Sequence, residues 1–213
     1  MNRKIFLSLF SIAVMAIMVG AVTYAYFSDS GTSSGNVFAT GTLDMQLAND
    51  NSTWTNSVTA SVGQTNMAPG DTFTGDLYVR NNGTVSANHL DLDFTNALTE
   101  AGSPPGDGTT PSFASVLEIS TFGYDSDGNG STDVNLRALI SDLNANEIID
   151  FADIEAMSGT AYSDLTNLNY AGTQSTGHLI HIDGRLHPSL ATNANQGDSD
   201  TVTFGIFMDQ GPH

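Results

Sequence analysis

Oxygen-bearing side chains recur at alternate positions in residues 142–153, DLNANEIIDFAD, a spacing typical of calcium loops. The candidate ligands stand at positions 1, 3, 5, 9 and 12 of a twelve-residue loop: Asp142, Asn144, Asn146, Asp150 and Asp153. Short carboxylate and amide side chains at this spacing can wrap a hard cation, and the acid at position 12 closes the coordination shell. Glu147 departs from the pattern because position 6 usually carries glycine.

A second stretch of the same kind lies just upstream, in residues 125–133, DSDGNGSTD. Its candidate ligands stand at positions 1, 3, 5 and 9: Asp125, Asp127, Asn129 and Asp133. Gly130 falls correctly at position 6, but Leu136 occupies position 12 and cannot coordinate a cation. The two stretches therefore predict a degenerate pair of structural calcium sites. The alternative is a pair of solvated acidic turns in which Asp133 and Asp150 cap helices.

No catalytic constellation emerges from the remaining polar residues. The chain lacks a His-Glu-x-x-His zinc motif, a Gly-x-Ser-x-Gly nucleophile elbow and any cysteine. His178 and His181 are three residues apart, which places them on opposite faces of a strand and makes them a poor metal pair. The sequence predicts that the protein is not an enzyme.

The elements that must carry these loops read mainly as strands. Apolar and polar residues alternate in five runs: residues 41–47, 72–84, 89–96, 178–186 and 200–210. Such alternation predicts short antiparallel strands with one buried face, separated by turns rich in Gly, Asn, Asp and Pro. The predicted fold is all-β, a β-sandwich of the jelly-roll type.

One region breaks the alternation. Between about residues 133 and 157 the apolar residues recur at helical spacing, at Leu136, Leu139, Ile140 and Leu143 and then at Ile154 and Met157. We therefore expect a short insertion of helix and calcium loops at about residues 123–160 of the sandwich domain, which itself covers residues 41–213.

The chain begins with the layout of a secretory signal peptide. Arg3 and Lys4 precede an apolar stretch that runs to Val22, and Thr23 and Ala25 suit the −3 and −1 cleavage positions. We expect residues 1–25 to be removed, which leaves no stable membrane anchor. The alternative is an uncleaved anchor, although no basic residues follow the apolar run as a stop-transfer flank.

Charge narrows the possible partners. After residue 25 the chain has three basic residues against twenty-three acidic ones, a net charge of −20. Such a surface repels nucleic acid and attracts divalent cations. Because the chain has no cysteine, an exported domain must gain robustness from bound metal or from packing against other copies.

Residues 26–40, YFSDSGTSSGNVFAT, lie directly before the first predicted strand. They form either a disordered tail or an extended strand that completes the sheet of a neighbouring subunit. In the second case the interface anchors are Tyr26, Phe27, Val37 and Phe38. A head-to-tail contact of this kind does not close on itself and therefore builds a filament.

Three segments carry a resemblance to a known family: AYFSDSGTSSGNVFATGTLDMQL (25–47), NMAPGD (66–71) and NANQGDSDTVTFGIFMDQ (193–210). The sequence resembles the TasA/camelysin family of secreted fibre subunits, whose archaeal relatives include bundling pilins and, more distantly, cannula tube proteins. The resemblance implies a jelly-roll subunit, export, and polymerisation by an N-terminal donor strand. Camelysin was named as a metallopeptidase, but this chain has no zinc-ligand motif.

The predicted protein is thus a secreted, extracellular or cell-surface subunit of a filament such as a pilus, a biofilm fibre or a cannula-like tube. Its partners are other copies of itself, in a head-to-tail homopolymer, and calcium ions. Two alternatives remain: a surface-anchored monomeric jelly-roll binding module, and a secreted hydrolase.

Overall fold

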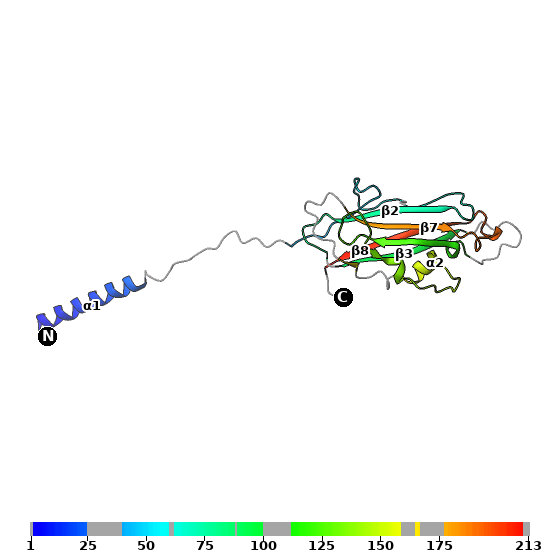
Figure 1. Cartoon of the computed structure of the whole chain (residues 1–213). Helices are drawn as coiled ribbons and strands as arrows, with labels where there is room; N and C mark the ends of the chain where they lie inside the picture. Colours follow the sequence, from blue (N-terminus) through cyan, green and yellow to red (C-terminus); the bar gives the residue numbers. More distant parts are fainter. Residues whose placement is uncertain are drawn as a thin grey trace. The chain divides into compact units, whose positions relative to one another are not determined.

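The computed structural model describes residues 2–24, 40–59, 62–87, 89–99, 112–158, 165–166 and 177–210. The chain divides into two compact units, Met1–Thr40 and Gly41–His213. The first unit holds one helix, α1 (Arg3–Tyr24), drawn in blue in Figure 1. None of the helices in the described ranges combines the length and the apolarity needed to cross a membrane.

The second unit is built on two antiparallel sheets (Figure 1). The larger sheet has the order β1-β2-β7-β4-β5, with β1 (Met45–Ala48), β2 (Thr72–Asn81), β7 (His178–Leu186), β4 (Leu117–Tyr124) and β5 (Val134–Asn135). The smaller sheet has the order β6-β3-β8, with β6 (Leu165–Thr166), β3 (His89–Thr99) and β8 (Ser199–Asp209). The chain alternates between the sheets as it passes through β2, β3 and β4 and again through β7 and β8, as in a jelly roll.

Strand alternation produces the core. Buried and exposed residues alternate along β2 and along the first half of β3, so that Phe73 and Leu77 face Leu92 and Phe94 across the sandwich core. The ring of Phe94 meets that of Phe122 edge-on at 5.6 Å between centroids. The all-β sandwich predicted from the sequence is confirmed, and β2, β3, β7 and β8 coincide with four of the five alternating runs.

Strand β4 has no counterpart among the predicted strands. Its register against β7 shifts between Ile119 and Thr121, a β-bulge that inserts one residue. The inward-facing residues are therefore Leu117, Ile119, Phe122 and Tyr124, and their spacing changes in mid-strand. A period-2 pattern cannot detect a strand whose period is interrupted in this way.

The insertion is less helical than its apolar spacing indicates. It contains β5, the 3-10 helix η2 (Leu136–Leu139) and the six-residue helix α2 (Phe151–Ala156), and residues 140–149 form neither helix nor strand. The helical prediction is wrong for that middle stretch, because the side chains of Asp142 and Asn144 accept hydrogen bonds from nearby backbone N–H groups. Two further 3-10 helices are η1 (Phe113–Val116) and η3 (Asn193–Asn195).

Candidate functional site

The first predicted calcium loop in chain order is the upstream one, which begins at Asp125, directly after β4. This residue is fully buried, and its carboxylate accepts hydrogen bonds from the N–H groups of Gly128 (2.8 Å), Asn129 (3.2 Å) and Gly130 (2.8 Å). The backbone therefore wraps around the carboxylate at position 1. Gly128 and Gly130, at positions 4 and 6, have positive φ angles of 72° and 88°.

The second loop in chain order, residues 142–153, repeats this geometry. The carboxylate of Asp142 accepts hydrogen bonds from the N–H groups of Asn146 (3.2 Å) and Glu147 (2.9 Å), at positions 5 and 6. Ala145 and Glu147, at positions 4 and 6, have φ angles of 58° and 71°. Glu147 thus adopts the left-handed conformation that the pattern normally assigns to glycine.

Three predicted ligands of the second loop converge on one point. The side-chain amides of Asn144 (2.9 Å) and Asn146 (2.8 Å) both contact the same oxygen, Oδ2, of Asp150. Asp150 is fully buried, and it caps the N-terminus of α2 in a reciprocal capping box with Asp153. Burial raises the pKa of Asp153, and the Asp150 charge adds to this effect. A half-turn of the two amide groups would present their oxygens to the same point.

The remaining predicted ligands are engaged locally. Both oxygens of Asp133 accept hydrogen bonds from Ser126, one from its hydroxyl and one from its N–H, each at 2.6 Å, and these bonds lower the pKa of Asp133. The Asn129 amide donates to Asp127 at 2.9 Å. Among the described residues, no three His, Asp or Glu side chains are grouped as a metal site requires. Calcium therefore stays a prediction that depends on the asparagine oxygens.

His178 and His181 lie on opposite faces of β7, as their spacing predicts. His178 is buried, and its Nδ1 lies 2.8 Å from the backbone oxygen of Asp125, so it supports the first loop. His181 lies on the outer face between Asp76 (2.6 Å) and Asp183 (2.9 Å). Both rings thus have structural partners on the protein.

Sequence reasoning did not identify a mostly apolar groove of about 500 Å³ in the sandwich. One wall comes from the larger sheet, with Leu47, Phe73 and Leu77, and the other comes from residues 200–204 of β8. Phe151 of α2 also lines it, together with residues 58, 59, 62–64 and 67 of the β1–β2 connection and residues 113 and 117. No single run in the sequence signals the groove, because its walls come from segments far apart in the chain.

The groove runs beside an open sheet edge. β8 pairs with β3 over all eleven residues, and within the described strands it has no partner on its other side. Val202, Phe204 and Met208 on its inner face are only partly buried, whereas Leu90 and Leu92 of β3 are 0% exposed. An unpaired edge with under-covered apolar side chains is suited to receive another strand.

The groove lies away from the end at which the N-terminal segment leaves the sandwich. Thr42 hydrogen-bonds Thr84, and Gln210 at the end of β8 hydrogen-bonds the backbone of Ser86, so these residues mark one end. Residues 200–204 precede Asp209 by five to nine positions, which corresponds to about 15 to 30 Å of strand. The predicted interface residues Tyr26, Phe27, Val37 and Phe38 lie outside the described residues.

Comparison with known proteins shows two similarities. Residues 1–110 match the family model described as camelysin metallo-endopeptidase. The chain is also 26% identical over 190 residues to the "Major biofilm matrix component" of Bacillus subtilis (strain 168), an alignment that covers 88% of this chain and 68% of that protein. The family model covers more than half of the 213 residues. The chain therefore belongs to the TasA/camelysin family, as its N-terminal and C-terminal motifs indicate.

Proposed function

We propose that this protein is a structural subunit of an extracellular fibre, of the kind found in a biofilm matrix. After removal of residues 1–25, residues 26–40 of one subunit extend along the groove of the next and pair with the free edge of β8. The similarity to a biofilm matrix component supports the fibre, and the groove supports the mode of assembly.

The observation that carries this proposal is the position of the groove. The donated segment leaves its own subunit at Gly41, near the end of β8, whereas the β8 wall of the acceptor groove is residues 200–204, in the first half of that strand. A subunit therefore presents its donor and its acceptor at different ends. Such a heterologous contact repeats without closing, so it yields a linear polymer.

Calcium is the second part of the proposal. Asp125 and Asp150 are fully buried carboxylates, and each lies in a loop whose neighbouring groups are acids and amides. Buried charge is costly without a counter-charge. A Ca²⁺ ion in the second loop would take oxygens from Asp142, Asn144, Asn146 and Asp150, and it would lower the repulsion between subunits of net charge −20.

Engineered cysteines test the donor-strand contact directly, because the natural chain has no cysteine. Ser34→Cys in the donated segment, combined with Thr201→Cys on β8, should give a ladder of covalent oligomers on oxidation. Because the register is not fixed beforehand, Cys at each position from 30 to 38 is scanned against Thr201→Cys. The readout is non-reducing electrophoresis of the exported protein, together with electron microscopy of the same sample.

The matched control places the second cysteine at Thr121, an exposed position on β4 in the other sheet. That pair should remain monomeric on the gel. Equal cross-linking to both positions, or filaments that persist when residues 26–40 are deleted, would overturn the donor-strand assignment. Mass spectrometry of the exported N-terminus checks the cleavage after Ala25.

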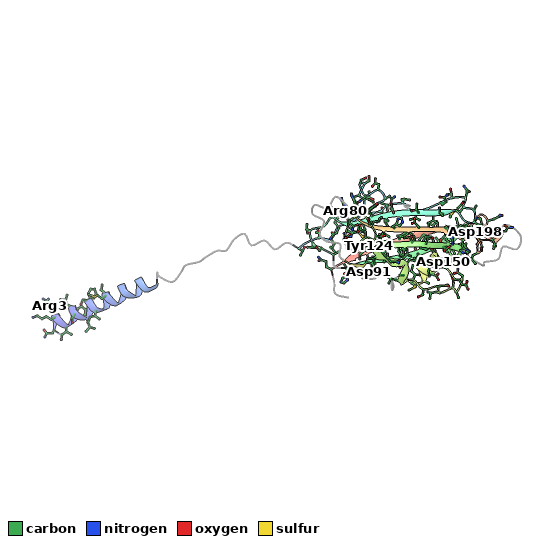
Figure 2. All side chains as sticks on the ribbon, viewed as in Figure 1. Arg3, Arg80, Asp91, Tyr124, Asp150 and Asp198 are labelled. Carbon is green, nitrogen blue, oxygen red and sulfur yellow. The ribbon has the colours of Figure 1, made fainter. Side chains whose placement is uncertain are left out.

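Calorimetric titration with Ca²⁺ tests the cation sites. Asp142→Ala should abolish binding to the second loop, and Asp125→Ala should abolish any binding to the first. Asp91→Asn is the control, because it removes one carboxylate from the end of the sandwich opposite Asp150 (Figure 2). Unchanged titration in both loop variants would remove calcium from the model of assembly.

A structural role also distinguishes this chain from the peptidase that the family description names. Assay of the exported protein on casein, with and without added Zn²⁺, should show no turnover above a sample without the protein. Zinc-dependent cleavage that disappears with His178→Gln or His181→Gln would favour the peptidase instead.

A further inference from the structure

Asp200 is the charged residue in the wall of a mostly apolar groove. It stands at the start of β8 opposite Leu98, and Asn96 stands opposite Val202 two residues further along the pair. Residues of an antiparallel pair that face each other share one side of the sheet. Asp200 and Asn96 therefore lie on the same inner face as Val202 and Phe204.

The side-chain oxygens at this position have no hydrogen-bond donor among the described residues. Both carboxylate oxygens of Asp200 and the amide oxygen of Asn96 are inaccessible to solvent and lack a hydrogen bond. The N–H groups of Ala97 and Thr201 lie near enough to lower the Asp200 pKa, but neither reaches hydrogen-bond geometry. Buried acceptors without donors reduce the stability of a fold, so a donor supplied to this wall of the groove would stabilise it.

Neighbouring charges add to that cost. Burial, together with the carboxylate of Glu155 on α2, raises the pKa of Asp200 to about 6. Asp198 lies two residues before it in the chain. The arginines of the domain are engaged elsewhere: Arg80 with Trp54 and Gln46, Arg137 with the backbone of Ile119, and Arg185 with Glu118. Figure 2 shows Arg80 toward the other end of the sandwich from Asp198.

The donated segment carries the hydrogen-bond donors that this wall lacks. In the proposed assembly the segment stays joined to its own subunit at Gly41, so its N-terminal residues would reach furthest along the neighbouring groove and residues 32–36 would lie closer to the groove's entrance. Residues 31–40, GTSSGNVFAT, contain hydroxyls at Thr32, Ser33, Ser34 and Thr40, an amide at Asn36 and no charged residue. Hydroxyl and amide groups can donate to a carboxylate without bringing a second negative charge.

We propose that Asp200, together with Asn96, is the polar recognition point of the acceptor groove and accepts hydrogen bonds from the hydroxyl and amide side chains of residues 32–36 of the neighbouring subunit. This inference rests on the proposed donor-strand assembly. Apolar contacts fix which face of the segment points inward, but a slip of two residues keeps the same face inward, so a polar contact is needed to select one register. Asp200 selects a segment with polar donors at the right distance from its apolar anchors.

The effect of pH on assembly distinguishes this role from passive burial. If Asp200 gains hydrogen bonds as a carboxylate, its pKa falls on assembly, and assembly strengthens as the pH rises through about 6. If the segment buries the carboxylate without donors, its pKa rises instead, and assembly weakens over the same range. The charged side chain that acts on Asp200 from α2 is the carboxylate of Glu155.

The experiment compares the exported protein with its Asp200→Asn variant by sedimentation of filaments at pH 7.5 and pH 5. We expect Asp200→Asn to raise the critical concentration about tenfold at pH 7.5, the usual effect of losing hydrogen bonds to a charged group. At pH 5 the two proteins should differ by less than about twofold, because Asp200 is then protonated. Asp209→Asn, the same change at the other end of β8, is the control and should not show this pattern.

A lower critical concentration for Asp200→Asn at pH 7.5 would overturn the inference, because it would mean that the carboxylate only opposes assembly. Thermal melts of the unassembled subunits check that each variant folds.

Double-mutant cycles with Thr32→Ala, Ser33→Ala, Ser34→Ala and Asn36→Ala complete the test: for the donor residue, the combined loss should be smaller than the sum of the separate losses. Additive losses would place the partner of Asp200 outside residues 32–36. Deletion of residues 26–40 tells the two proposals apart. If that deletion leaves filaments intact, donor-strand assembly itself fails. If the deletion abolishes filaments while Asp200→Asn changes nothing, only the role of Asp200 fails.

Discussion

Glu147 has a backbone conformation that is unfavourable for a residue with a Cβ atom. Its φ angle of 71° lies in the left-handed region, where a residue with a Cβ atom is disfavoured by about 1–2 kcal/mol. The N–H group of Glu147 nevertheless donates to Asp142, and that bond closes the turn. The loop therefore keeps the geometry of a calcium loop at a position where its sequence departs from the pattern.

Glu147→Gly should stabilise the protein. Glycine removes the steric cost and loses some stability through its greater freedom in the unfolded chain, so the net gain should be up to about 1 kcal/mol. Chemical denaturation measures the change in the free energy of unfolding. Glu147→Gln is the control, because it removes the charge and keeps the Cβ atom. An equal gain in both variants would mean that charge, and not backbone strain, is responsible.

His181 makes stability depend on pH. Burial by itself lowers the pKa of His181, but the hydrogen bonds and charges of Asp76 and Asp183 outweigh burial and raise the pKa above its usual value of 6.5. The folded state then binds the proton more tightly than the unfolded state does. The resulting stabilisation is complete below pH 6.5 and is lost as the pH rises through the folded-state pKa.

His181→Gln should therefore cost more stability at pH 5.5 than at pH 8.5. The side chains of His181 and Asp76 are 25% and 44% exposed, so the difference should stay below about 1 kcal/mol. Urea unfolding of both proteins at the two pH values measures it. A larger loss at pH 8.5 would contradict the sign of the shift.

At the scale of elements, glycine allows the central strands to pack closely. Gly184 of β7 stands between Phe73 of β2 and Ile119 of β4. A Cβ atom at Gly184 would lie 2.2 Å from the ring of Phe73 and 2.3 Å from the backbone oxygen of Glu118. The ring of Phe73 also stacks on that of Phe151 at 5.7 Å, so this crowding reaches α2 and the groove.

Gly184→Ala should destabilise the subunit by at least about 2 kcal/mol, because backbone and ring must both move. The comparison is Gly63→Ala in the β1–β2 connection, where no atom of the described residues lies within 4 Å of the added atom. Thermal unfolding should show a clear loss for the first variant and no loss for the second. Equal effects would mean that the close approach at Gly184 is not the cause.

At the scale of the whole molecule, charge opposes assembly. With twenty-three acidic residues against three basic ones after residue 25, copies of the domain repel one another in dilute buffer. Screening by salt shortens the range of this repulsion to about 8 Å at physiological ionic strength.

Filament formation should therefore increase as NaCl rises from about 10 to about 150 mM, even in the presence of a chelator. Light scattering and electron microscopy follow the assembly. Ca²⁺ at the same ionic strength should promote assembly further, and Mg²⁺ should do so less, because Mg²⁺ retains its water more strongly. If assembly responds identically to Ca²⁺ and Mg²⁺, the effect of calcium is charge screening alone.

Much of this protein can be predicted from local patterns. Period-2 alternation locates β2, β3, β7 and β8, because each of these strands buries one face. The alternate Asp and Asn residues of the two loops predict turns built around a carboxylate, and Asp125 and Asp142 both accept the backbone N–H groups that such turns present. These features are local, since the residues that form them lie within a few positions of one another.

Other features depend on contacts between distant residues. The bulge in β4 interrupts the alternation, so the strand is defined only by its pairing with β7. The groove joins Leu47, Phe73 and Phe151 to β8, and no sequence period links positions so far apart. Asp200 reads in the sequence as one acid among many. Burial without a hydrogen-bond donor for either carboxylate oxygen makes it distinctive, because only the tertiary structure decides which of twenty-three carboxylates lose contact with both water and donors.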